Sequence, residues 1–119
     1  MEKGRKFKAG YDAVDAATDM RYQVKSRRLH NLKTSRQLSA LRKLPDSSFD
    51  FLAGVLFNKD YSIMRAAIIP HDIVKSRARF QEHTNIWTFF LDDSIWNLPG
   101  VRDVTQHLRS AATNLDTRS

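Results

Sequence analysis

FDFLAGVLF (Phe49–Phe57) and YSIMRAAII (Tyr61–Ile69) are two strongly apolar runs joined by the triplet NKD at positions 58–60. The triplet consists of residues that favour turns, so the two runs are predicted to form a hairpin. Apolar residues fill nearly every position from Phe51 to Phe57 instead of alternating with polar ones. A strand that is apolar on both faces is typical of the centre of a sheet covered on each side. We therefore expect this hairpin to form the core, which is predicted to include Phe51, Leu52, Val55, Leu56, Ile63, Ile68 and Ile69.

The segments before the hairpin predict two more strands and a helix. Residues 10–17 and Arg21–Leu29 have the composition of strands, and the turn-forming residues 18–20 between them predict an antiparallel pair. A helix is predicted over Thr34–Leu44, because a Thr or Ser can cap its start. Its leucines recur at three-residue spacing on one face, at Leu38, Leu41 and Leu44.

Three further elements are expected after the hairpin. Pro70 can begin a helix that continues to about Arg79, and Trp87–Leu91 reads as a short strand. The C-terminal stretch Val101–Asn114 predicts an amphipathic helix, with its inward side formed by Val101, Val104, Leu108, Ala111 and Ala112. The resulting order is β-β-α-β-β-α-β-α. We expect an α/β (α+β) fold with a central mixed sheet flanked by helices, as a single domain over residues 1–119.

Composition limits the possible functions. The 119 residues suffice for one domain with one core. The chain has no cysteine, which excludes disulfides, thiolate metal sites and a cysteine nucleophile. No apolar run approaches the roughly 20 residues of a membrane helix, and the basic N-terminus is not followed by the apolar segment of a secretory signal. These features predict a cytoplasmic protein without a membrane partner.

Positive charge is concentrated in the first part of the chain. The net charge is +7, with a balance of +8 over residues 1–44 and −1 over residues 45–119. A localised basic region favours a polyanion-binding surface over a merely soluble one. The candidate nucleic-acid contacts are Arg27, Arg28, Lys33 and Arg36. By contrast, Lys75, Arg77 and Arg79 are interpreted mainly as charges that keep the protein in solution.

The first predicted strand pair contains residues suited to metal chemistry. Gln23 and Lys25 point to one face of their strand, and the turn at 18–20 lies midway between Asp12 and Lys25. A carboxylate (Asp12), an amide oxygen (Gln23) and the backbone carbonyl of Val24 are hard ligands that suit Mg²⁺ or Mn²⁺. Such an ion lowers the pKa of a bound water, and the Lys25 ammonium can orient that water and stabilise the transition state. Asp15 is expected on the opposite face.

The spacing Gly10-x-Asp12 followed by Gln23-x-Lys25 resembles the PD-(D/E)xK, or restriction-endonuclease-like, nucleases, in particular the Mrr-like branch. The resemblance covers roughly residues 8–70. It implies that Asp12 and Gln23 hold the metal, that Lys25 is the catalytic lysine, and that the protein is a Mg²⁺-dependent DNA endonuclease. Two features depart from the family. Gln23 replaces the commoner Glu, and with nine residues before Gly10 the chain is expected to lack the usual N-terminal helix.

Other interpretations of the same residues remain open. A catalytically inactive DNA-binding or interaction module could keep this scaffold, and a basic RNA-binding domain is a third alternative. The aromatic residues Trp87, Phe89, Phe90 and Trp96 are expected in the core or in an oligomer interface in preference to stacking on bases. Two active sites would serve the two strands of DNA, so we expect a homodimer.

Overall fold

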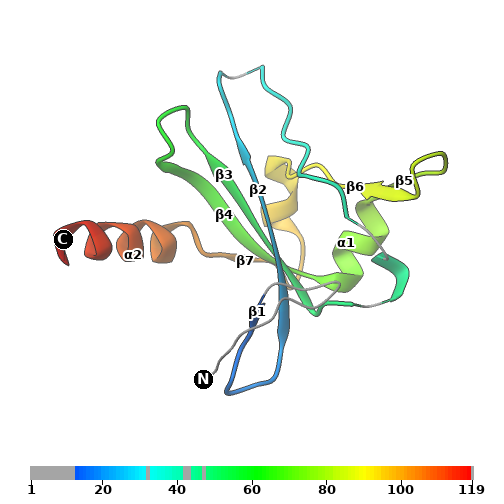
Figure 1. Cartoon of the computed structure of the whole chain (residues 1–119), viewed down its shortest axis with the longest axis horizontal. Helices are drawn as coiled ribbons and strands as arrows, with labels where there is room; N and C mark the ends of the chain where they lie inside the picture. The colour runs from blue at the N-terminus through cyan, green and yellow to red at the C-terminus, as the bar shows by residue number, and fades with distance from the viewer. Residues whose placement is uncertain (1–12, 32, 42–43, 47, 119) are drawn as a thin grey trace.

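The computed structural model describes residues 13–31, 33–41, 44–46 and 48–118 (Figure 1). The strands are β1 (Ala13–Val14), β2 (Arg21–Arg28), β3 (Phe51–Phe57), β4 (Ile63–Pro70), β5 (Arg79–Gln81), β6 (Ile86–Thr88) and β7 (Arg102–Asp103). The helices are α1 (His71–Arg77) and α2 (Thr105–Arg118), and two short 3-10 helices are η1 (Leu44–Asp46) and η2 (Asp93–Asn97).

A mixed five-stranded sheet organises the described chain, in the order β1-β2-β3-β4-β7. The predicted core hairpin is confirmed, because β3 lies at the centre of the sheet and pairs antiparallel with β4. The first predicted pair is also confirmed, since β1 pairs antiparallel with β2. Strand β2 runs parallel to β3. Parallel neighbours need a crossover connection, and here residues between β2 and β3 provide it.

The predicted core is confirmed in part. Leu52, Leu56 and Ile69 are fully buried and Val55 is nearly so. In contrast, Phe51, Ile63 and Ile68 are only half-buried. Burial is deepest on the face of the sheet that carries Leu52 and Leu56. A covering layer packs on this face, and its buried residues include Leu38, Leu41, Phe89 and Leu91.

The helix predicted over Thr34–Leu44 is wrong. Residues 36–41 contain no helix, and their backbone pairs with β6 and the residues directly after it: the Leu38 N–H donates to the Phe89 carbonyl at 2.9 Å, and Leu41 exchanges two hydrogen bonds with Trp87. The three leucines at 38, 41 and 44 are buried as expected. Their spacing suits a helix, but pairing with a distant extended segment satisfies the same backbone groups and buries the same side chains.

The elements after β4 follow the prediction less closely. Helix α1 begins directly after Pro70, as expected, and ends at Arg77. The strand expected over Trp87–Leu91 is shorter, and β6 pairs with β5 in a separate two-stranded sheet. Helix α2 starts at Thr105, because residues 102–103 form β7 beside β4.

Helix α2 also differs in its contacts. Val104 and Leu108 are half-buried, whereas Ala111 and Ala112 are exposed and not inward as predicted. In Figure 1, α2 extends away from the sheet, on the side opposite to α1 and the β5–β6 pair. The fold is thus α+β with a mixed sheet, and the predicted order β-β-α-β-β-α-β-α is not what the structure has. Within the described residues, no helix is both long enough and apolar enough to span a membrane.

Candidate metal and nucleic-acid site on strand β2

Strand β2 presents two of the candidate site residues, Gln23 and Lys25, on the covered face of the sheet. In the parallel ladder, Gln23 is the partner of Leu52 and Lys25 is the partner of Gly54. Side chains of laterally paired residues point to the same face, so Gln23 and Lys25 share the face of the buried Leu52. Both are half-buried, whereas Val24 points to the other face and is 46% exposed. The predicted shared orientation of Gln23 and Lys25 is therefore confirmed.

Gly54 shapes the space next to Lys25. A Cβ atom at this position would lie 2.9 Å from Cδ2 of Leu91 and 3.5 Å from Cδ1 of Leu38. The absence of a side chain lets these two leucines of the covering layer approach the sheet backbone. The hydrophobic core consequently reaches the sheet backbone directly beside the half-buried Lys25.

A paired arginine and aspartate fix the start of β2 against β3. The Arg21 N–H and Nε donate to Oδ2 of Asp50 at 2.8 and 3.2 Å, and Arg21 Nη2 donates to Oδ1 at 3.2 Å. The hydrogen bond from the Arg21 side chain is the main reason why the pKa of the Asp50 carboxyl lies below its ordinary value. Asp50 also holds α1, since its carbonyl accepts from the His71 N–H at 2.9 Å. Strand β2, which carries the candidate residues, and helix α1 are thus attached to one residue.

Asp12, the proposed carboxylate ligand, lies outside the described residues, as does Gly10. The adjacent ladder is described: Ala13 pairs with Tyr22 and Val14 pairs with Arg21. Asp15 follows β1 and stabilises the turn, because its Oδ1 accepts from the Ala17 N–H at 2.8 Å. Among the described residues, no three His, Cys, Asp or Glu side chains group together.

The predicted basic residues do not form one continuous cluster. Arg27 is exposed on the face of Lys25, and its Nη1 donates to the Gln37 carbonyl at 3.3 Å. Arg28 points to the other face, donates to the Lys59 carbonyl at 3.4 Å, and lies over the Tyr61 ring with its guanidinium carbon 4.6 Å from the centroid. Lys33 is exposed.

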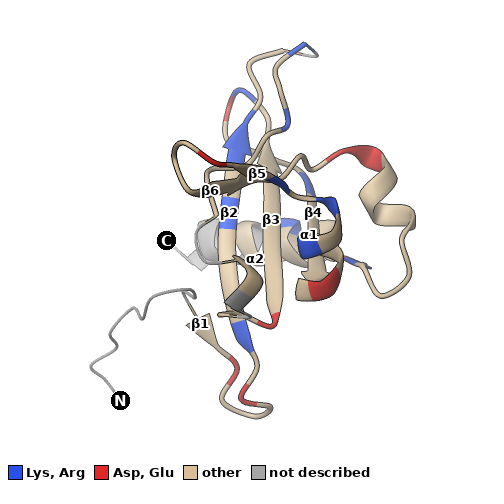
Figure 2. Ribbon diagram, turned by 90° about the vertical axis from the view of Figure 1, so that its right-hand side faces the viewer, with Lys and Arg blue, Asp and Glu red and all other residues tan. Residues whose placement is uncertain are grey.

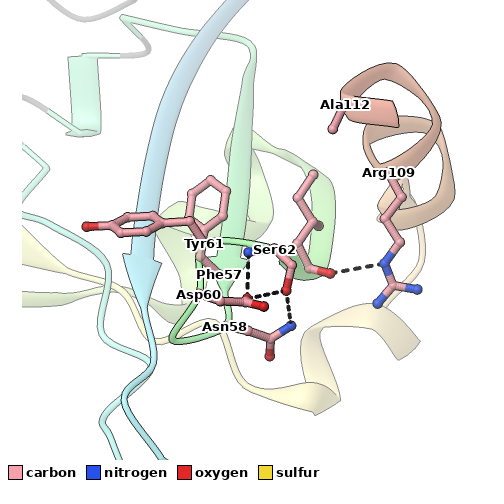
Figure 3. Close-up of a pocket in the computed structure, with 8 residues that line it drawn as sticks. Phe57, Asn58, Asp60, Tyr61, Ser62, Arg109 and Ala112 are labelled. Atoms are coloured by element: carbon pink, nitrogen blue, oxygen red, sulfur yellow. Dashed lines mark hydrogen bonds between the residues drawn. The ribbon is translucent and has the colours of Figure 1, made fainter. Parts of the chain in front are cut away.

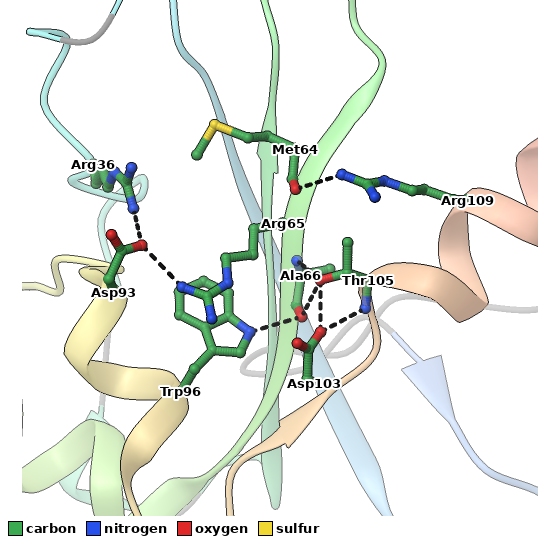
Figure 4. A network of polar contacts seen from close by, with 9 residues as sticks. All are labelled: Arg36, Met64, Arg65, Ala66, Asp93, Trp96, Asp103, Thr105 and Arg109. Carbon is green, nitrogen blue, oxygen red and sulfur yellow. Dashed lines mark hydrogen bonds and ion pairs between the residues drawn. The ribbon is translucent and has the colours of Figure 1, made fainter.

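Arg36 belongs to a polar network (Figure 4) that sequence alone did not reveal. Its Nη1 lies 2.6 Å from Oδ1 of Asp93, and Arg65 Nη1 lies 2.9 Å from the same oxygen. Arg36 is the main reason why the pKa of Asp93 is lowered. The guanidinium of Arg65 also stacks on Trp96, 4.0 Å from the ring centroid. Asp93 is 57 positions from Arg36 along the chain, and no sequence pattern indicates such a pair.

A separate pocket of about 770 Å³ lies between the turn of the β3–β4 hairpin and α2 (Figure 3). Its polar groups are largely engaged with each other. Asp60 Oδ1 accepts from the Ser62 hydroxyl at 2.6 Å, and Arg109 Nε donates to the Ile63 carbonyl at 3.0 Å. The Ser62 hydrogen bond lowers the pKa of Asp60. None of the proposed metal ligands lines this pocket.

Lysine and arginine residues are distributed over several elements in Figure 2, along β2, on α1 and at the start of β5. Comparison with models of protein families and with curated proteins finds no match to this chain. The functional assignment therefore depends on the residues themselves.

Proposed function

We propose that the chain is a Mg²⁺-dependent DNA endonuclease of the PD-(D/E)xK type, with Asp12, Gln23 and Lys25 as its active-site residues. The observation that carries the proposal is the shared orientation of Gln23 and Lys25 at half-buried positions on one face of β2. The third member, Asp12, is proposed from the sequence pattern and lies outside the described residues. The described β1–β2 ladder supports it, because the pair Ala13–Tyr22 joins the residues that follow Asp12 and precede Gln23.

The proposed donors fit a small divalent cation. A carboxylate, an amide oxygen and the backbone carbonyl of Val24 are all hard oxygen donors, and Mg²⁺ prefers such ligands while keeping positions for water and phosphate. Asp12 supplies the one full negative charge of this set. When bound, the ion provides Lewis-acid activation of the phosphodiester and a more acidic water.

Lys25 then acts directly on the reacting groups. Its ammonium holds the attacking water near the phosphorus and donates hydrogen bonds to the oxygens that gain negative charge in the transition state. One P–O bond forms to the water oxygen, one P–O bond to the sugar oxygen breaks, and the sugar oxygen leaves with a proton. The half-buried position of Lys25 next to the apolar core strengthens these charge interactions, because water screens them less.

DNA binding is proposed to come from Arg27 and Lys33, assisted by Arg28. Arg27 lies on the same strand face as Lys25, two residues farther along β2. At about 3.3 Å per residue, this places its Cα within about 7 Å of the Lys25 Cα. Arg27 is thus positioned to contact a phosphate next to the one that is cleaved.

A plasmid-nicking assay tests the proposal. Purified protein with Mg²⁺ or Mn²⁺ is expected to convert supercoiled DNA to the nicked form, and a chelator should stop the reaction. If the protein binds DNA but nicks none with either ion, the alternative of a non-catalytic DNA-binding module on the same scaffold is correct.

A further inference from the structure

A small pocket on the covering layer has features that the proposed active site does not use. It has a volume of about 340 Å³, within the range of small-molecule sites. Its lining residues are Arg77, Arg79, Phe90, Asp92, Ser94 and Ile95. We call it the Arg77 pocket.

The two arginines reach the rim of this pocket because α1 ends where β5 begins. Arg77 is the last residue of α1 and Arg79 is the first of β5, with Ala78 as the extended cap between them. Both side chains are exposed. Within the described part of the chain, neither guanidinium takes part in a hydrogen bond or ion pair, unlike Arg36 and Arg65. They are therefore available for a ligand.

The other lining groups determine which ligand fits. Phe90 leaves 38% of its surface exposed although its neighbour Phe89 is fully buried, and Ile95 is buried at the pocket. Asp92 precedes η2, and its side chain makes no capping hydrogen bond there. A bare phosphate does not match this set, because it would leave the Phe90 ring and the Asp92 carboxylate without a partner. A nucleotide matches the arginines, the exposed ring and the carboxylate, because it offers phosphates, a base and an exocyclic amino group.

We infer that the Arg77 pocket binds one unpaired nucleotide of a nucleic-acid strand. Arg77 and Arg79 contact its phosphates, Phe90 stacks on the base, and Asp92 accepts a hydrogen bond from an exocyclic amino group. Guanidinium groups combined with an exposed aromatic ring are the usual elements of single-strand recognition. The inference extends the proposed nuclease function to a substrate with an unpaired segment, but the pocket can bind a strand whether or not the β2 site cleaves it.

The test is single-stranded oligodeoxynucleotide binding, measured by fluorescence anisotropy across a salt series. It uses the full chain carrying Lys25→Ala, without divalent ions, so that cleavage plays no part. Arg77→Ala and Arg79→Ala should each reduce the slope of log affinity against log salt by about 0.7 for every phosphate that is no longer neutralised. Arg102→Ala is the matched control, because it removes the same charge from an exposed residue of edge strand β7 that does not line the pocket, and it should leave the slope unchanged.

The base contact has its own matched pair. Phe90→Ala should weaken single-strand binding by roughly 5- to 100-fold, as expected for one stacked base. Phe80→Ala removes a similarly exposed ring outside the pocket and should have little effect. Thermal unfolding of each variant checks that the fold is kept.

Each failure has a separate meaning. If the arginine variants behave like Arg102→Ala, the inference is wrong, even when the wild-type protein nicks plasmid DNA. If the arginine variants lose affinity and Phe90→Ala does not, the site contacts phosphates only and the nucleotide assignment is overturned. If all three lose affinity while no nicking occurs, the inference holds and the nuclease proposal fails.

Discussion

Lys25 and Gly54 are direct partners in the parallel ladder between β2 and β3, so the proposed catalytic lysine lies beside the one position of β3 that has no side chain. Leu91 and Leu38 occupy the space above Gly54. The covering layer therefore packs directly against the sheet backbone next to the candidate site.

Gly54→Ala should destabilise the protein by about 1–3 kcal/mol, the usual cost of adding a methyl group to a packed core. The new Cβ would lie 2.9 Å from Leu91 Cδ2, which must move. Urea unfolding measures the change. In a Leu91→Ala background the clashing methyl group is absent, so the penalty should shrink. An equal penalty in both backgrounds would show that Leu91 is not the cause.

Leu56→Ala should cost about 2–5 kcal/mol of unfolding free energy, because Leu56 is fully buried in the central strand. Val24→Thr is a suitable comparison, since Val24 is 46% exposed on β2 and surface changes usually stay within about 0.5 kcal/mol. Chemical denaturation measures both. A Leu56→Ala loss as small as that of Val24→Thr would mean that β3 is peripheral to the core.

Asp50→Asn should change how stability depends on pH. The hydrogen bond from Arg21 lowers the pKa of folded Asp50 below its ordinary value of 3.8. The charged carboxylate therefore contributes stability above that pH, and the contribution is lost as the pH falls through the folded pKa. The wild-type protein should lose its advantage over Asp50→Asn under acid conditions. An advantage that is constant from about pH 2 to pH 6 would contradict this role of the ion pair.

Arg27→Ala and Arg36→Ala should differ in their effects on duplex DNA binding. Among the described residues, the Arg27 side chain has a neutral carbonyl as its hydrogen-bond partner, at 3.3 Å, so its loss should reduce the salt slope by about 0.9 per phosphate contact. Arg36 is held by Asp93, so its replacement should reduce the slope less. Fluorescence anisotropy across a salt series measures both. Equal reductions would show that Arg36 leaves Asp93 when DNA binds.

The sequence predicts the strands of this fold better than its connections. The apolar runs around Leu56 and Ile69 identify the central hairpin, because a doubly covered strand needs apolar side chains on both faces. Alternation on β2 similarly predicts that Gln23 and Lys25 share a face. These signals are local, and the structure agrees with them.

Long-range pairing is what the sequence does not reveal. Leu38 and Leu41 are spaced as in a helix, yet their backbone bonds to Phe89 and Trp87, a choice decided by tertiary packing and not by propensity. The Arg36–Asp93 pair and the Arg77 pocket likewise join distant segments. The basic residues at the end of α1 and the start of β5, interpreted from sequence as charges for solubility, line a pocket only because the fold brings Phe90 beside them.

Plasmid nicking by matched variants tests the central claim most directly. Asp12→Asn and Asp15→Asn each remove one negative charge at nearly constant size, and Asn at position 15 keeps the acceptor for the Ala17 N–H. With Mg²⁺ or Mn²⁺, Asp12→Asn should abolish both nicking and metal binding, whereas Asp15→Asn should retain both. Lys25→Ala should reduce nicking by at least about 100-fold, as expected for loss of a group that stabilises the transition state, while Mn²⁺ still binds in a calorimetric titration. An active Asp12→Asn protein together with an inactive Asp15→Asn protein would contradict the proposed site.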